Sequence, residues 1–450
     1  MATGSGVPPR LPTGLLTSLG GTRGSLAPAA RGGVARLAPV VLLLGLPLVV
    51  AALRQSACAA NGWEGREPVW RECAAPLFSS LVEQDAGRGL IAYLTGEVPL
   101  TVPVVPGVVT TGLATLAPGD GLTQQRGVLL LWVAVAAVLL AGLVVLVGTV
   151  HGHPGADPVA LALSPVLALT VLLSADLVPL ALAVAALWAW SRRRPELAGV
   201  LVGLAVLGSR PALAVLLALA LTPPARTRAA VRRLLTAVGV TLLLVVGPLV
   251  AFAPELLTGP VRLWWAGGAG SGSPWFVPTL AQHPLPGGAV AVLSVLGMLL
   301  AAGMMLVLAS RQPRPSTADV ALLGLVVLLA TGPAYPVAAA VWLVPFVALA
   351  GVRWRDHLLW AGAEVVHSVA WFGWLTGETD GAHGLPPGWY AAALVLRLFA
   401  VGRLAWVVWA RASWGGGAFA ATLERLPTRP GDPPAAGVGS DAHPPVTERP

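Results

Sequence analysis

The stretch WRDHLLWAGAEVVHSVAW, residues 354–371, is apolar and long enough to cross a lipid bilayer. Near its middle it carries two ionisable residues, Glu364 and His367. An ionisable side chain at membrane depth costs about 3 kcal/mol on insertion scales, so it is usually paired or faces a cavity. The stretch therefore indicates a membrane helix that makes a buried polar contact.

The composition of the whole chain supports this interpretation. Hydrophobic residues make up 56% of the 450 residues and charged residues only 11%, with a mean hydropathy of +0.78. These values exclude an ordinary soluble globular protein. The net charge of +8 comes from arginines in short loops between apolar runs, which is the positive-inside pattern, so nucleic-acid binding is not expected. We predict an all-α, multi-pass protein of the cell membrane.

The order of apolar runs and arginine-bearing loops predicts the topology. Apolar runs cover residues 37–53, 127–150, 158–173, 176–190, 197–221, 234–253, 287–309, 318–332, 335–350, 357–375 and 388–410. Arginine-bearing loops cover residues 191–196, 225–233, 310–315 and 351–356 and should all be cytoplasmic. This holds if 197–221 is two short helices that meet at GSRPAL (208–213), where Pro211 breaks the run. The result is about twelve membrane helices with both termini cytoplasmic.

The same pattern predicts three parts of the chain. Residues 1–35 form a disordered basic arm, 36–411 a membrane domain and 412–450 a disordered Pro-rich tail. Two long extracytoplasmic loops, 54–126 and 254–286, interrupt the membrane domain.

Both cysteines, Cys58 and Cys73, fall in the first extracytoplasmic loop. An oxidising exterior favours a disulfide between them; the alternative is two unpaired thiols. The spacing of apolar residues in this loop predicts short interfacial or re-entrant helices. The second loop carries Trp264, Trp265 and Trp275, which suit either an aromatic belt at the membrane interface or a sugar-stacking or lipid-gating role.

The order of these segments resembles the actinobacterial glycosyltransferase family 87, a group of the GT-C superfamily. The resemblance rests on SPVLALTVLLSADLVPLALAVAALWAWSRRRPELAGVLVGLA (164–204), on the opening stretch, and on WYAAALVLRLFAVGRLAWVVWAR (389–411). It implies a GT-C-like helix bundle that transfers mannose from a polyprenyl-phosphate donor. It also implies functional positions at Asp176, Glu364 and Arg397, with His367 where tyrosine is common in the family.

Several polar elements of the family are absent from this chain. The stretch CAAPL (73–77) has Pro76 where the family has an acidic catalytic residue, and VPVVPG (102–107) lacks a second acid. The turn GSRP (208–211) lacks the family's lysine but offers Arg210, while TGPAYPVAAAVW (331–342) lacks the family's lysine and glutamine. These departures put catalytic activity in question.

Glycosyl transfer from a lipid phosphate needs a base for the acceptor hydroxyl and cations for the leaving phosphate. The carboxylates of the first extracytoplasmic loop (loop one, residues 54–126) that could supply the base are Glu72, Glu83, Asp85 and Glu97. Asp85 and Glu97 flank the predicted interfacial segment and are the catalytic candidates; the alternative is that they are solvated loop residues. Arg88 and Arg210 are the candidate phosphate-binding cations, the alternative being interfacial snorkelling.

Helix geometry predicts the partner of the buried residue Glu364. At 1.5 Å per residue, Glu364 lies about 12 Å above the inner start of its helix and Arg397 about 13 Å below the outer start of the next. In a core of roughly 30 Å these heights agree within a turn. We expect a buried Glu364–Arg397 ion pair with His367 on the same face, serving either to fix helix register or to line a lipid-phosphate groove.

The sequence thus supports two main functions. One is a membrane hexosyltransferase that uses a polyprenyl-phosphate-linked sugar donor and a lipid or glycan acceptor. The other is a catalytically degenerate relative that acts as a membrane scaffold or binds lipid carriers, and a secondary transporter is a third. No cofactor is assigned, although a divalent cation is compatible with the chemistry. His151, His153 and Asp157 share a short loop, where solvated residues are favoured over a metal site.

Overall fold

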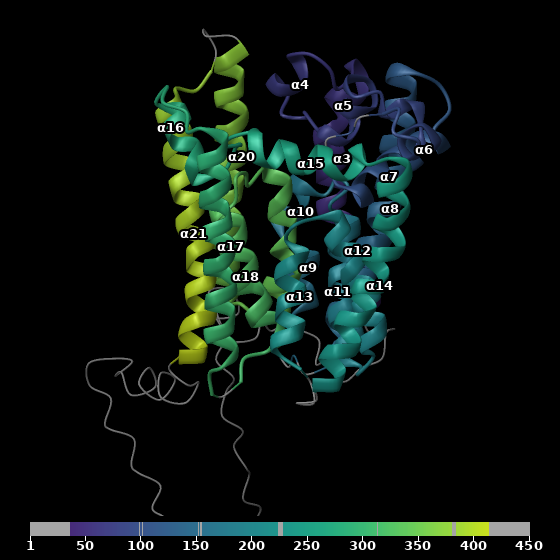
Figure 1. The fold of residues 1–450 in the computed structure, drawn as a ribbon. Helices are drawn as coiled ribbons and strands as arrows, with labels where there is room; N and C mark the ends of the chain where they lie inside the picture. Colours follow the sequence, from purple (N-terminus) through teal and green to yellow (C-terminus); the bar gives the residue numbers. More distant parts are fainter. Residues whose placement is uncertain are drawn as a thin grey trace, which may run out of the picture.

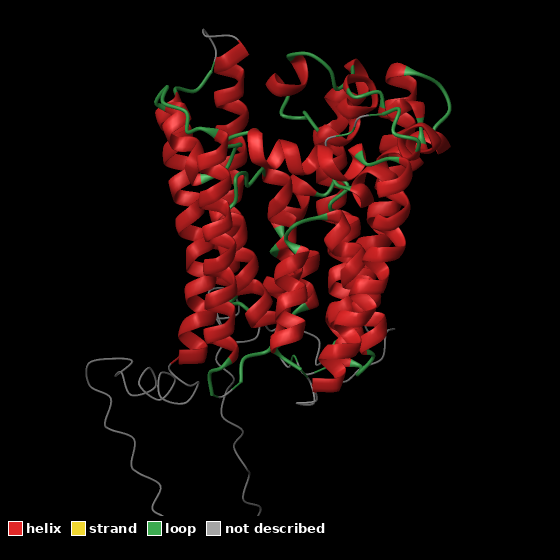
Figure 2. Cartoon of the chain, viewed as in Figure 1, coloured by secondary structure: helices red, strands yellow, loops and turns green. Residues whose placement is uncertain are grey.

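The computed structural model describes residues 37–98, 100, 102–151, 153, 155–223, 228–312, 314–379 and 384–413. Within these ranges every regular element is a helix and there is no strand (Figures 1 and 2). The prediction of an all-α fold is therefore confirmed for the described part of the chain. The predicted arm, 1–35, lies outside these ranges, as does the tail from residue 414 onward.

Within the described part of the chain, five segments are long and apolar enough to cross a bilayer. They are α2 with α3 (Ala38–Leu43 and Gly45–Asn61), α8 (Gly121–Thr149), α14 (Arg228–Phe252), α17 (Gly287–Ala309) and α21 (Pro387–Ser413). Large apolar side chains on their outer faces, such as Leu130, Leu243 and Phe399, are exposed and would face lipid. This is the build of a helical membrane protein. α21 ends at Ser413, two residues beyond the predicted end of the membrane domain.

The remaining apolar helices are shorter, at 10–17 residues. They are α7 (Val104–Leu116), α9 with α10 (Pro158–Ala162 and Pro165–Thr170), α11 (Leu177–Ser191), α12 (Pro195–Gly208), α13 (Ala212–Leu221), α18 (Thr317–Thr331), and η4 with α19 (Val337–Trp342 and Val344–Leu349). A helix of ten residues is about 15 Å long, half of a roughly 30 Å hydrocarbon core. The count of about twelve membrane helices therefore stays a prediction.

The long helices form two groups joined by short ones (Figure 1). α8, α11, α12 and α14 pack together on one side, and α17, α18, α21 and α20 (Trp354–Thr379) pack on the other. α13 contacts both groups, and α10 lies between α3 and α20. The break between α12 and α13 falls at residues 209–211, which confirms the predicted split helix. Pro211 directly precedes α13, where its missing N–H costs no helical hydrogen bond.

The first long loop forms a cap of short helices at one end of the bundle, the upper end in Figure 1. These are α4 (Glu67–Trp70), α5 (Pro76–Glu83), η2 (Ala86–Arg88), α6 (Leu90–Leu94) and α7. Cys58 and Cys73 form a disulfide, which confirms the predicted pairing. The Gln125 side chain, on the first turns of α8, donates to the Phe78 carbonyl (3.2 Å) and to Glu64 (2.7 Å). These contacts fasten the cap to the membrane helices.

The second long loop lies at the same end and contains α15 (Glu255–Ala266), η3 (Pro274–Phe276) and α16 (Val277–Leu280). α15 packs against α17 and α14 and leaves Val261, Leu263 and Trp265 exposed. Phe276 packs edge-on against Trp374 and Tyr390, with ring centroids 5.4 and 6.2 Å apart. Aromatic packing therefore joins this loop to α20 and α21.

Candidate functional site

A cavity of about 230 Å³ lies among elements of both helix groups. One wall is the turn before α11, with Asp176, and the break between α12 and α13, with Ser209 and Arg210. Another wall is the segment 332–336 after α18, of which all residues except Tyr335 line the cavity. Pro103 from the cap and Trp264 from α15 also line it. The turn between α11 and α12 lies at the lower end of the bundle in Figure 1, so Asp176, directly before α11, and Ser209, directly after α12, lie at the other ends of these two helices.

Asp176 and Arg210 are the charged residues that line this cavity among the residues described. The Asp176 carboxylate accepts a hydrogen bond from the Ser174 hydroxyl at 2.9 Å and interacts with Ser209 and Arg210. The sequence predicted both residues separately, and the structure brings them together. A carboxylate beside a guanidinium can accept a proton while the cation holds an anion.

The sequence did not single out Trp342, which also lines the cavity. Its side chain is fully buried, and its indole N–H has no hydrogen-bond partner among the described residues. An unsatisfied buried donor is rare in folded proteins, and this one belongs to a residue that lines the cavity. The other lining residues are mainly apolar, including Met298, Leu328 and Leu329. The cavity thus combines a small polar centre with an apolar surround, as ligand sites do.

The wall at residues 332–336 is fastened to the second long loop by backbone and side-chain hydrogen bonds. Gly270 N donates to Pro333 O (2.7 Å), and Tyr335 N donates to Ser271 O (3.0 Å). The Ser273 hydroxyl donates to Gly332 O at 2.9 Å. These bonds pair backbone groups of two irregular segments and join the second loop to the cavity wall.

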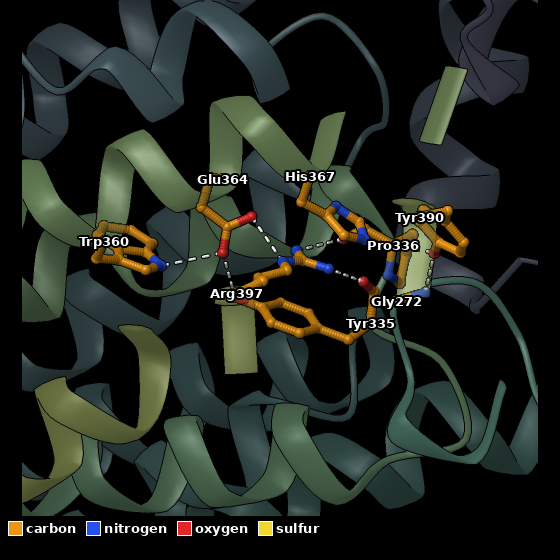
Figure 3. Close-up of polar contacts among 8 residues, drawn as sticks. All are labelled: Gly272, Tyr335, Pro336, Trp360, Glu364, His367, Tyr390 and Arg397. Atoms are coloured by element: carbon orange, nitrogen blue, oxygen red, sulfur yellow. Dashed lines mark hydrogen bonds and ion pairs between the residues drawn. The ribbon is translucent and has the colours of Figure 1, made fainter. Parts of the chain in front are cut away.

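Behind this wall, Glu364 of α20 and Arg397 of α21 form the predicted ion pair (Figure 3). Arg397 Nε lies 2.8 Å from Glu364 Oε2, and both side chains are fully buried. The Tyr335 hydroxyl and the Trp360 indole N–H each donate to Glu364 Oε1 at 3.0 Å. The carboxylate is therefore fully hydrogen-bonded, as a buried charge requires.

The same arginine also holds the wall of the cavity. Its guanidinium donates to the carbonyls of Tyr335 and Pro336 and stacks 3.5 Å from the centre of the Tyr335 ring. Neither Glu364 nor Arg397 lines the cavity. The contacts favour the alternative in which the pair fixes the register of α20 and α21 over a direct role in a lipid-phosphate groove.

His367 lies beside this cluster, as the sequence predicted, but its ring does not contact Glu364. Its Nε2 is 3.4 Å from the Tyr390 hydroxyl, which in turn accepts from Gly272 N at 3.0 Å (Figure 3). His367 is fully buried, and its Nδ1 has no partner among the described residues. It belongs to the packing behind the wall and does not line the cavity.

The loop-one candidates lie elsewhere. Arg88 and Glu97 form an exposed ion pair with each other, and Asp85 is an exposed residue at the turn before η2. The structure places neither carboxylate in the cavity with Asp176 and Arg210. Both positions match the alternative of solvated loop residues.

The three tryptophans of the second loop have three different environments. Trp264 lines the cavity, Trp265 is exposed, and the Trp275 indole donates to Thr331 O at 3.0 Å. Of the three, only Trp264 therefore lines the cavity.

The short loop at residues 151–157 is built for helix capping. Asp157 accepts from Val159 N and Ala160 N at the start of α9 and from the Trp354 indole. Across the described residues no group of three His, Cys, Asp or Glu side chains could hold a metal ion.

The fold and the cavity together define a helical membrane protein with a polar site among its short helices. The chain matches no protein-family model, and no curated protein has a similar sequence.

Proposed function

We propose that the chain is a membrane glycosyltransferase that moves mannose or a similar hexose from a polyprenyl-phosphate donor to a lipid or glycan acceptor outside the cytoplasm. The observation that carries the proposal is the placement of Asp176 and Arg210 on one cavity with an apolar lining. The choice of sugar and lipid carrier comes from the sequence resemblance.

In this proposal, Asp176 removes the proton from the acceptor hydroxyl. The hydroxyl oxygen attacks the anomeric carbon of the sugar, and the bond between that carbon and the phosphate oxygen breaks. Polyprenyl phosphate leaves with the electron pair, and Arg210 stabilises its charge. The Trp342 N–H supplies a further donor to the phosphate, and the apolar lining receives the first units of the prenyl chain.

Asp85 and Glu97 have no part in this mechanism because neither lines the cavity. The catalytic base is therefore reassigned to Asp176.

The second candidate is a catalytically degenerate relative that binds a lipid carrier or acts as a scaffold. It is favoured by the lack of any described loop-one carboxylate in the cavity lining. The Arg210 and Trp342 donors would still bind a lipid phosphate, but no transfer would follow.

We further propose that the short apolar helices complete the membrane domain, with about twelve crossings in the cell membrane and both termini in the cytoplasm. The support is the positive-inside pattern of the arginine-bearing loops. On this topology the lower end in Figure 1 faces the cytoplasm.

The test separates the two candidates by comparing transfer with binding. Membranes with and without the wild-type chain are incubated with radiolabelled mannosyl polyprenyl phosphate, and labelled lipids and glycans are extracted. A labelled product that depends on the chain supports the transferase. Retention of the lipid on the purified chain without any product supports the carrier-binding relative. If there is neither product nor retention, both candidates are excluded.

A further inference from the structure

A second and larger cavity, of about 520 Å³, lies at the opposite end of the bundle. It is formed where the loops after α8, α11, α13 and α17 meet. Its volume would hold a phosphate-bearing molecule or a lipid headgroup. The proposed glycosyl transfer makes no use of this cavity.

The charged and titratable residues among its lining are Arg193, Arg314, His151 and His153. No carboxylate lines the cavity within the part of the chain that the structure describes. Arg193 and Arg314 make no ion pair or side-chain hydrogen bond to any described residue. Two arginines therefore line one cavity without an anionic partner among the described residues.

Three other arginines at this end have partners. Arg192 stacks 5.1 Å from the Trp188 ring, Arg311 stacks 5.6 Å from the Trp409 ring, and Arg233 pairs with Glu196. Asp319, the acid nearest in sequence to Arg314, bonds Ser316 and lies 3.8 Å from Arg411. Unlike these three arginines, Arg193 and Arg314 line the cavity and have no side-chain partner among the described residues.

His153 provides a fixed, uncharged part of the wall. Its Nδ1 lies 3.0 Å from His151 O and its Nε2 lies 3.4 Å from Ala318 N, so Nδ1 donates and Nε2 accepts. Burial lowers the pKa of His153, in agreement with a neutral ring. His153 therefore adds no positive charge to that of the two arginines. Arg193 adopts a left-handed backbone conformation, with φ of 59°, at the turn between α11 and α12.

We propose that this cavity binds a phosphate-bearing anion through Arg193 and Arg314. Guanidinium groups bind phosphate with paired, charge-assisted hydrogen bonds, and two of them on one carboxylate-free cavity form a site for that chemistry. The anion comes either from a soluble phosphate compound or from the headgroup of an anionic phospholipid. The proposal stands independently of the function assigned to the first cavity, the one lined by Asp176 and Arg210, which we call the upper cavity.

The experiment compares Arg193→Gln/Arg314→Gln with Arg228→Gln/Arg232→Gln in the purified full chain. The control pair removes the same charge from exposed residues of α14 that do not line the cavity. All proteins carry Arg210→Gln, so that phosphate binding at the upper cavity does not contribute. One arm titrates inorganic pyrophosphate by calorimetry in a neutral detergent. The other measures retained phosphatidylglycerol, against phosphatidylcholine, by native mass spectrometry.

We expect one of these two probes to bind the chain that carries Arg210→Gln alone and the α14 control variant with equal affinity. Its affinity should fall at least about tenfold in Arg193→Gln/Arg314→Gln, because two charge-assisted contacts are lost. Binding of pyrophosphate alone identifies a soluble ligand, and selective retention of phosphatidylglycerol identifies a lipid. If the double variant does not elute as a single folded species, Arg314→Gln alone is used, since Arg314 is exposed. The proposal is overturned if neither probe binds, or if the cavity and control variants bind equally.

Discussion

Arg397 Nε lies 2.8 Å from Glu364 Oε2, and the guanidinium of the same arginine donates to the carbonyl of Tyr335. One buried side chain thus joins two helices to an irregular segment. Because residues 332–336 form a wall of the upper cavity, the ion pair positions that wall without contacting the cavity itself. This explains why an apolar helix carries a carboxylate near its middle.

The first prediction concerns this pair. Glu364→Gln or Arg397→Gln should each destabilise the protein by about 3 to 5 kcal/mol, because each leaves a buried charge without its partner. Glu364→Gln/Arg397→Gln should cost less than the sum of the two single changes. Thermal unfolding of the purified protein in detergent measures all three. Strictly additive losses would show that the two side chains are not coupled.

Charge reversal gives a second, sharper prediction. Glu364 is surrounded by the donors of Tyr335 and Trp360, whereas Arg397 faces carbonyl oxygens. Glu364→Arg/Arg397→Glu restores the net charge but sets donors against donors and oxygens against oxygens. We therefore expect its yield of folded protein to stay as low as that of the single variants. Recovery to the wild-type level would mean that the surrounding hydrogen bonds contribute little.

The third prediction tests the joint between the second loop and the cavity wall. Gly272 has φ of +75°, and a Cβ there would lie 1.9 Å from the Tyr335 carbonyl oxygen. Gly268 has a similar φ of +71°, but a Cβ there meets nothing within 4 Å. Both Gly→Ala changes carry a left-handed penalty of about 1 kcal/mol, and only Gly272→Ala adds a clash with backbone.

We expect Gly272→Ala to lower the unfolding temperature further than Gly268→Ala and to weaken binding of polyprenyl phosphate. Equal effects of the two substitutions on both measurements would refute the idea that this joint sets the cavity wall.

A fourth prediction uses two buried tryptophans. Trp342→Phe removes an indole N–H that has no partner among the described residues. The substitution therefore breaks no hydrogen bond, and the free energy of unfolding should not include such a loss. It should nevertheless weaken polyprenyl phosphate binding, measured with a fluorescent analogue. Trp360→Phe removes a hydrogen bond to Glu364 and should destabilise the fold by about 1.5 to 3 kcal/mol. Unchanged binding by Trp342→Phe would remove this donor from the proposed site.

The disulfide yields the fifth prediction. Cys58 and Cys73 are 15 residues apart, and closing a loop of that length stabilises a fold by about 3 kcal/mol. Cys58→Ser/Cys73→Ser should speed tryptic cleavage at the exposed Arg71, because the cap opens more often. Reductant should have the same effect on the wild type and none on the variant. Equal cleavage rates in every case would mean that the other contacts of the cap are sufficient.

Much of this architecture could be predicted from the sequence because it follows from local rules. Pro211 in an apolar run predicted the helix break, and matching heights in a bilayer predicted the contact between Glu364 and Arg397. The position of Cys58 and Cys73 in one loop predicted their disulfide. Each of these expectations needs only helix geometry or the membrane as a solvent.

The cavity could not be predicted in the same way. Trp342 reads as one more apolar residue until tertiary packing leaves its N–H without a partner. Asp85 and Glu97 were chosen for their loop, but packing turns them to the surface. Long-range packing decides each of these features, and no local pattern encodes it.

The measurement that tests the account most directly is transfer of radiolabelled mannose from polyprenyl phosphate by purified wild type, Asp176→Asn and Asp85→Asn/Glu97→Gln. Asp176→Asn keeps the size of the side chain but cannot accept the proton, so we predict at least about a hundredfold loss of rate. The loop-one double variant should keep the wild-type rate within a few fold. Transfer that survives Asp176→Asn, or that disappears only in the loop-one variant, would contradict the assignment of the upper cavity as the active site.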